Sequence, residues 1–540
     1  MSTADVSPDA TPSQAASPTS WWQTVDQKLE SLGEYLNPIL VKETRQALKS
    51  RQFAVTFALV LLTSWLWSLL AIYFRYPGIL YSPDGPFLMV GYLDILLFPL
   101  VVIIPFSAFR SLASEREDGT FELLSISTLG PRQIILGKLV SSIVQMLVYL
   151  SALAPCLAFT YLLRGIDIIT IAYVLICAFL ASVLLSGVGL VLACVTRQRH
   201  WQSALSVIVI LLFIFLFVIG LMISYGSIYE DAGWRQYDDV DFWIVTGALF
   251  SAYLSYLYLT IEVASAQITF ESENRSAGIR RGILVQHFLL IGWFGYLAIR
   301  NPREEEILMV LMTMLCLHWF IMGSFINGES PVLSPRVKRT IPNLLADRIW
   351  RNWRLPGPDR GYFLVLTSLV SGLLVVSLLI WFNRFSTLSV GGAVNGIVYS
   401  AGLVGYTICY LSVGRLFLRL LNMIFRADIF VSVILHLILL MGGVMLPLGF
   451  QVLTNRTMDQ NFHHWTNPFW FFVESIDSSS FTSQPLIGPF VIFLWVLGTM
   501  LFLVNLLLGT RDFLPKREDD PRFQPERLPA KIEDAADPLA

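Results

Sequence analysis

The sequence predicts an all-α polytopic membrane protein with about twelve transmembrane helices. Of its 540 residues, 55% are hydrophobic and only 14% are charged, and the mean hydropathy is +0.64. Water-soluble domains contain about 45–50% apolar and about 25% charged residues, so this composition requires a lipid environment. A bilayer core about 30 Å thick is crossed by about 20 apolar residues of helix. Twelve stretches of the chain meet this requirement.

The twelve stretches are separated by polar connections. The first six are residues 53–74, 87–109, 139–163, 166–195, 203–224 and 242–261. The second six are residues 283–299, 307–326, 362–382, 395–413, 429–450 and 486–508. The seventh stretch is the shortest, and the tenth is rich in glycine. An error in either would leave the first six spans unchanged.

The basic residues indicate the direction of the spans. Membrane proteins keep an excess of lysine and arginine in their cytoplasmic loops. When both termini are placed in the cytoplasm, most of the 37 basic residues fall on the inner side, and the alternation holds through all twelve spans. We therefore expect a multi-pass protein of the cytoplasmic membrane with both termini inside.

Composition divides the chain into four regions. Residues 1–20 are rich in serine, threonine, alanine and proline and lack the features of a signal peptide, so we expect residues 1–36 to form a mostly disordered tail. Residues 37–262 hold six spans, and residues 263–510 hold a second membrane region with about six more. Residues 511–540 are charged and rich in proline, which predicts a second disordered tail.

A polar segment precedes the first span. Asn37 is a favourable helix cap, and Pro38 suits the first position of a helix. Lysines and arginines after it can meet anionic head groups while Ile39 and Leu40 enter the membrane interface. The segment is therefore either an interfacial helix or a plain cytoplasmic extension of the first span.

A charged segment, Ser114-Glu-Arg-Glu-Asp-Gly-Thr-Phe-Glu-Leu-Leu124, lies between the second and third spans. Its acidic residues gather on the cytoplasmic side, and Gly119 permits a reversal of the chain. Thr120 can then cap a short helix that ends before Pro131. Such a helix would transmit force to both spans, but an ordinary charged loop explains the spacing equally well.

The charged segment and the following Ser-Thr-Leu-Gly-Pro-Arg-Gln-Ile-Ile-Leu-Gly-Lys138 resemble the loop between the second and third spans of ABC-2 type transporter permeases, the membrane-spanning subunits of ABC transporters. The stretch Asn37-Pro-Ile-Leu-Val-Lys-Glu-Thr-Arg45 resembles their interfacial helix. The resemblance covers roughly residues 37–262. Both motifs occupy the matching places in the topology.

This resemblance implies a separate ABC ATPase subunit that contacts residues 115–124 and reshapes the membrane cavity when ATP drives its closure. ATP and Mg would be bound by that partner, whereas no cofactor is expected in this chain. A second permease chain is a further partner left open. The ATPase-coupling residues that the resemblance implies are Glu115, Glu117, Gly119, Thr120, Glu122 and Leu123.

The second half of the chain departs from a six-span permease. If the chain were two equal fused halves, a second coupling motif would be expected between spans eight and nine. That connection begins Asn327-Gly-Glu-Ser-Pro-Val-Leu-Ser-Pro-Arg-Val-Lys-Arg339, which is basic and interrupted by prolines. The sequence therefore predicts a helical extension in place of a duplication.

Several other functions lack the residues they need. Six residues separate Gly130 from Gly137-Lys138, whereas a phosphate-binding loop has four and continues with serine or threonine, so we expect no ATPase activity in this chain. The five cysteines lie in apolar runs without CxxC spacing, and the histidines are single or adjacent, so we predict no metal site. His318 and His436 are expected to form hydrogen bonds between helices. A net charge of −2 gives no sign of a nucleic-acid partner.

Asp94 is a candidate for the transport path. A carboxylate near mid-membrane costs about 2.5–3.5 kcal/mol on insertion scales, which favours a paired or functional role. Pro99 and Pro105 in the same span can bend it and free carbonyl groups. The alternative function is a secondary transporter with twelve helices driven by an ion gradient. Such a carrier should show several buried carboxylates and an internal repeat, whereas only Asp94 qualifies.

Overall fold

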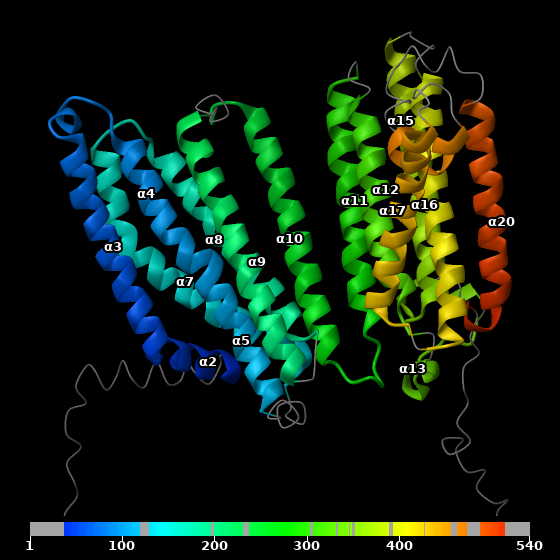
Figure 1. Cartoon of the computed structure of the whole chain (residues 1–540), viewed down its shortest axis with the longest axis horizontal. Coiled ribbons are helices and arrows are strands. Elements are labelled where there is room, and N and C mark those ends of the chain that lie inside the picture. Colours follow the sequence, from blue (N-terminus) through cyan, green and yellow to red (C-terminus); the bar gives the residue numbers. More distant parts are fainter. Residues whose placement is uncertain are drawn as a thin grey trace, which may run out of the picture. The chain divides into compact units, whose positions relative to one another are not determined.

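The computed structural model describes residues 37–118, 129–195, 199–230, 237–302, 306–330, 333–344, 346–347, 352–387, 393–425, 427–454, 462–471 and 487–513. Within these residues there is no strand, and twelve helices are long and apolar enough to cross a membrane (Figure 1). The predicted all-α fold with twelve spans is confirmed, and the protein is an integral, multi-pass membrane protein. The chain forms two compact units, Met1–Arg235 and Gln236–Ala540.

Among its described residues, the first unit contains a short helix and five spans. The short helix is α2 (Pro38–Lys49), and the first span is α3 (Arg51–Arg75). The second span consists of α4 (Gly85–Phe98), the π-helical turn η2 (Pro99–Ile103) and α5 (Ile104–Glu117). The remaining elements are α7 (Pro131–Leu162), α8 (Ile168–Ala193), α9 (Arg199–Tyr225) and the turns η1 (Gly78–Leu80) and η3 (Gly226–Glu230). The second span is central, because α4 contacts α3, α7 and α9 while α5 contacts α7, α8 and α9.

Helix α2 is distinct from the first span. The Asn37 side chain accepts a hydrogen bond from the backbone nitrogen of Ile39 at 3.0 Å, and Pro38 follows as predicted. The helix ends because Ser50 has an extended backbone, with ψ at 139°, and its hydroxyl instead caps α3 by accepting from the backbone nitrogen of Phe53 at 3.1 Å. Figure 1 shows α2 running across the lower end of α3. The predicted helix start is confirmed, and the alternative of a plain extension is wrong.

The two prolines of the second span set a π-helical turn. The backbone nitrogen of Ile104 donates to the carbonyl of Pro99, five residues earlier. In this register the carbonyl of Leu100 would pair with residue 105, which is a proline without an N–H group. The hydroxyl of Ser182 on α8 donates to this carbonyl instead. The prediction that these prolines free a carbonyl group is confirmed, and a neighbouring helix supplies its hydrogen-bond donor.

The second unit contains seven spans and several short elements. The spans are α10 (Val240–Ile268), α11 (Ser276–Arg300), α12 (Glu306–Asn327), α15 (Pro358–Thr387), α16 (Ala393–Asn422), α17 (Ile429–Thr454) and α20 (Ile487–Phe513). The short elements are α13 (Pro335–Arg339), η5 (Asn352–Arg354) and η6 (Phe462–Thr466). Helix α12 is central and contacts α11, α15, α16 and α17. Trp319 of α12 and Leu411 of α16 are fully buried in the apolar core of this unit.

The structural division differs in detail from the four predicted regions. The sixth span, α10, packs against α11 and belongs to the second unit, so the division falls before it and not at residue 262. Helix α20 continues to Phe513 and so includes the first three residues of the predicted C-terminal tail, which was expected to start at residue 511. The N-terminal tail, residues 1–36, and the rest of the C-terminal tail, residues 514–540, lie outside the described residues.

Candidate functional site at the end of the second span

The side chain of Lys138 is 1% exposed, about two turns into α7. A buried ammonium group is costly unless it is paired and hydrogen-bonded. Its Nζ lies 2.8 Å from Oε1 of Glu43 on α2 and 3.1 Å from Oε2 of Glu115 on α5, and it donates to the carbonyl of Ser111 at 3.4 Å. We call Glu43, Lys138 and Glu115 the lysine triad. It joins α2, α5 and α7 at the end of the unit predicted to face the cytoplasm.

Helices α2 and α7 are held together by close backbone packing as well. The Asn37 amide donates to the carbonyl of Gln133 at 2.5 Å. Gly137 makes room for this contact, because a Cβ at that position would lie 3.0 Å from Nδ2 of Asn37 and 3.1 Å from Cβ of Ile39. The glycine immediately before Lys138 therefore allows Glu43 to reach the ammonium group.

A second set of contacts ties the last turn of α5 to α8 and α9. Nη1 of Arg110 lies 3.5 Å from Oε1 of Glu117 and 3.4 Å from the hydroxyl of Ser206 on α9. Nη1 of Arg116 donates to the carbonyl of Cys194, which ends α8, at 2.9 Å. Burial raises the pKa of the Cys194 thiol to about 11, although the nearby Arg116 guanidinium lowers it. The third, fourth and fifth spans of the unit, α7, α8 and α9, thus all contact the end of α5.

Helices α5 and α8 pack closely above these contacts. A Cβ on Gly189 of α8 would lie 2.7 Å from the carbonyl oxygen of Pro105 and 3.5 Å from Cβ of Phe109. Only a glycine permits this approach without displacing backbone. A shift of α5 along its axis would therefore displace α8 and the π-helical turn that precedes α5.

The predicted coupling residues are only partly within the described residues. Glu115 and Glu117 lie in the last turn of α5, are less than one-fifth exposed, and form ion pairs inside the unit. Gly119, Thr120, Glu122 and Leu123 lie outside the described residues. Their roles remain predictions.

The sequence reasoning missed two members of the lysine triad. The predicted third span begins at residue 139, which places Lys138 in the loop before it, whereas α7 begins at Pro131 and contains Lys138. Glu43 is the only acidic residue of α2, a helix that otherwise carries lysines and an arginine. A lysine inside an apolar helix, together with one acid in a basic helix, is the signal that could have identified the pair.

Asp94 lies on α4 beside Ser224 of α9. It is half-buried, and neither its Oδ1 nor the hydroxyl of Ser224 forms a hydrogen bond within the described part of the chain, although both atoms are buried. A carboxylate and a hydroxyl between two spans can bind a polar group. The assignment of Asp94 to a transport path stays a prediction.

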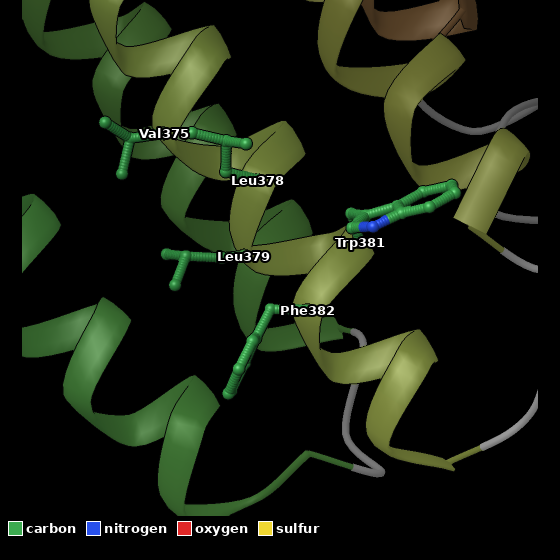
Figure 2. Close-up of a pocket in the computed structure, with 5 residues that line it drawn as sticks. All are labelled: Val375, Leu378, Leu379, Trp381 and Phe382. Atoms are coloured by element: carbon green, nitrogen blue, oxygen red, sulfur yellow. The ribbon is translucent and has the colours of Figure 1, made fainter.

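An apolar hollow of about 510 Å³ on the second unit lacks the features of a polar substrate site. It lies along α15 and is lined by Val375, Leu378, Leu379, Trp381 and Phe382. Figure 2 shows Val375, Leu379 and Phe382 on one side of the helix and Trp381 on the other, so no polar groups converge there. Leu378, Trp381 and Phe382 are exposed, as expected of side chains that face lipid.

The polar histidines and acids of the described ranges do not assemble a metal centre. No group of three or more histidine, cysteine, aspartate or glutamate side chains within those ranges could hold a metal ion. His436 lies 3.3 Å from the Asn327 amide, ring nitrogen to Nδ2, which confirms its predicted role between helices. Nε2 of His318 has no hydrogen-bond partner in the described structure, although its ring packs on Trp319.

Residues 37–236 match the family model described as "ABC-2 family transporter protein". The match begins at the cap of α2 and includes the lysine triad, the π-helical turn and Asp94. It ends before α10, close to the boundary between the two units. Comparison with curated proteins and with solved structures finds no match.

Proposed function

Since residues 37–236 belong to the ABC-2 transporter family, we propose that this chain is a permease subunit of an ATP-binding cassette transporter and that a separate ATPase subunit drives it. ATP and Mg are bound by the partner. The chain supplies the membrane path and receives mechanical work. In this proposal the plasma membrane holds the complex, and both termini lie in the cytoplasm.

The lysine triad carries the proposal. Glu115 lies near the end of α5, just before the segment that joins the second and third spans, and Lys138 lies in α7, just after that segment. These two residues are joined 3.1 Å apart, and Glu43 adds α2 to the same contact. A force applied to residues 119–128 therefore acts on α2, α5 and α7 together. Glu115 is a positioning residue in this scheme, because its carboxylate faces Lys138.

The second span provides a route from this contact into the membrane. Helix α5 leads to the π-helical turn at Pro99–Ile103 and then to α4, which carries Asp94. Turns of this kind commonly occur at functional sites of helices. Movement of α5 at the inner end can change the direction of α4 at this turn. The Asp94 and Ser224 pair between α4 and α9 would then open or close toward the substrate.

Affinity purification of the full chain from its native membranes tests this function. A soluble subunit with a nucleotide-binding fold should copurify, and Leu123→Arg should reduce its recovery while leaving the amount of membrane-inserted permease unchanged. Tyr81→Arg is the control, because Tyr81 is 87% exposed in the connection between the first two spans, which the topology places outside. A purified chain without any nucleotide-binding subunit that moves solute on an ion gradient would exclude the proposal and favour the secondary transporter.

A further inference from the structure

The second unit repeats the arrangement of the first five spans. Span two contacts spans one, three, four and five, which are α3, α7, α8 and α9. Span eight, α12, contacts spans seven, nine, ten and eleven, which are α11, α15, α16 and α17. The contacts among the surrounding helices correspond too. The contact of α3 with α7 is matched by that of α11 with α15, and the contact of α7 with α8 by that of α15 with α16. The contact of α8 with α9 is matched by that of α16 with α17. The sixth and twelfth spans do not correspond. The sixth span, α10, contacts α11, whereas the twelfth span, α20, contacts α15 and α16.

The connection between spans eight and nine consequently occupies the same place as the charged segment between spans two and three. It also begins with an acid held by a buried cation. Oε2 of Glu329, just after α12, lies 2.6 Å from Nη2 of Arg280, whose side chain is fully buried on α11. In the first unit, Glu115 at the end of the second span is also held by a buried cation, Lys138, which lies on the following span, whereas Arg280 lies on the preceding one.

Arg280 also fixes the far end of this connection. Its Nη1 donates to the carbonyl of Leu355 at 2.7 Å and to that of Trp353 at 3.1 Å. Its Nη2 donates to the carbonyl of Gly357 at 2.8 Å, directly before α15. One guanidinium therefore joins the end of span eight, the start of span nine and span seven. A force on this connection would act on all three spans.

The described part of this connection forms a small folded surface, which we call the α13 platform: residues 333–344 together with η5 and Leu355. Leu333, Val337, Ile341 and Leu355 make its own apolar cluster. The Ser334 hydroxyl donates to the carbonyl of Ser272 at 2.7 Å. Arg336 pairs with Glu273 at 3.2 Å, and the Asn274 amide donates to the carbonyl of Arg354 at 2.8 Å. The platform is thus fixed to the segment that precedes α11.

We propose that the α13 platform is a second docking surface for an ATPase subunit, the counterpart of residues 115–124. This inference rests on the proposed function. The platform presents a basic helix that carries Arg336, Lys338 and Arg339. Arg336 and Arg339 are exposed and Lys338 is partly exposed, so the docking face of the ATPase at this position is acidic. Val337, the buried residue of α13, is used inside the platform's own cluster and is not available to enter a bilayer, which favours a protein partner over a membrane surface.

Native mass spectrometry of the purified complex measures the number of ATPase subunits bound to each permease chain. Two docking surfaces on one chain predict two ATPase subunits for each permease chain. The double substitution K338E/R339E should halve this number, while R281E should leave it at two. Arg281 is the matched control because it is an exposed arginine at the same end of the unit, on α11. One ATPase per wild-type chain, or two ATPases bound to K338E/R339E, would overturn the proposal.

Photo-crosslinking separates this inference from the function on which it rests. p-Benzoylphenylalanine is placed at position 119 or at position 339 of the full chain, in the presence of the ATPase subunit that copurifies. Adducts with that subunit from both positions support the α13 platform as a docking surface. An adduct from position 119 alone, with only lipid or no adduct from position 339, rejects the platform and leaves the proposed function intact. If no ATPase is captured at either position, both proposals fail.

Discussion

The ammonium group of Lys138 lies 3.1 Å from the carboxylate of Glu115, with the lysine side chain almost fully buried between the second span, the third span and α2. The pair links the start of the charged segment, at the end of α5, to the third span that follows it. Glu43 adds a second carboxylate from α2, 2.8 Å from the ammonium group, and Lys42 lies 3.5 Å from Glu115 at the exposed rim. Because Lys42 is 59% exposed, its contribution is small and the buried triad dominates.

Lys138→Met should destabilise the first unit by about 3–5 kcal/mol, because Glu43 and Glu115 would be left close together without a buried counterion. Thermal unfolding of the detergent-purified chain, followed by fluorescence-detected size exclusion, measures the loss. The triple variant Glu43→Gln/Lys138→Met/Glu115→Gln should recover most of it, because the unpaired charges are removed. If Lys138→Met alone were as stable as the wild type, the lysine triad would not stabilise the contact among α2, α5 and α7.

Gly137→Leu should separate α2 from α7 and cost about 1–3 kcal/mol, because even a Cβ would press on Asn37 and Ile39. The same unfolding assay, with protease sensitivity of the segment around residue 50, reports the detachment of α2. Gly292→Ala is the control, since nothing lies within 4 Å of a Cβ there and alanine favours a helix by about 1 kcal/mol. Equal effects of the two substitutions would argue against the close packing of α2 on α7.

Ser182→Ala should leave the carbonyl of Leu100 without a donor and destabilise the unit by about 0.6–1.7 kcal/mol, the range for hydrogen bonds between membrane helices. Pro105→Ala restores an N–H group at the position that the π-helical register directs toward this carbonyl. Adding Pro105→Ala to Ser182→Ala should therefore return part of the lost stability. If the double variant is less stable than the sum of the two single changes, the explanation of the turn is incorrect.

The Cys194 thiol should resist alkylation at pH 7.5. Burial raises its pKa to about 11, so the thiol is protonated at neutral pH and only the thiolate is reactive. Reactivity should rise as the pH approaches 11. Arg116→Ala should shift the rise to higher pH, because the guanidinium lowers this pKa. Mass spectrometry of a variant that keeps Cys194 as its sole cysteine measures the labelling, and rapid modification at pH 7.5 would contradict the packing around α5 and α8.

The spans were predictable from sequence because about 20 consecutive apolar residues are a local property. The start of α2 was predictable for the same reason, since Asn37 and Pro38 act on their immediate neighbours. The lysine triad was not, because its three residues are far apart in the chain and each alone resembles an ordinary positive or negative charge near a membrane surface. The packing of Gly137 on Ile39, together with the hydrogen bond from Asn37 to Gln133, brings Glu43 to Lys138.

The repeated helix arrangement was missed for a similar reason. A duplicated half would be recognised in the sequence by a second Gly-Thr-x-Glu-Leu-Leu, whereas the structure repeats contacts between helices and a buried cation beside an acid. In the first unit the cation is Lys138 on the third span, and in the second it is Arg280 on span seven. Since a different helix supplies the cation, no alignment of the two connections could reveal the correspondence.

The rate of ATP hydrolysis by the purified complex of the full chain and its ATPase subunit tests the central claim most directly. In the proposed function, work enters the permease through the segment after α5. Gly119→Pro, which blocks the predicted chain reversal, should leave membrane insertion intact. The account predicts that hydrolysis by this variant falls to the rate of the ATPase subunit without the permease. An unchanged rate, together with unchanged recovery of the ATPase subunit, would contradict it.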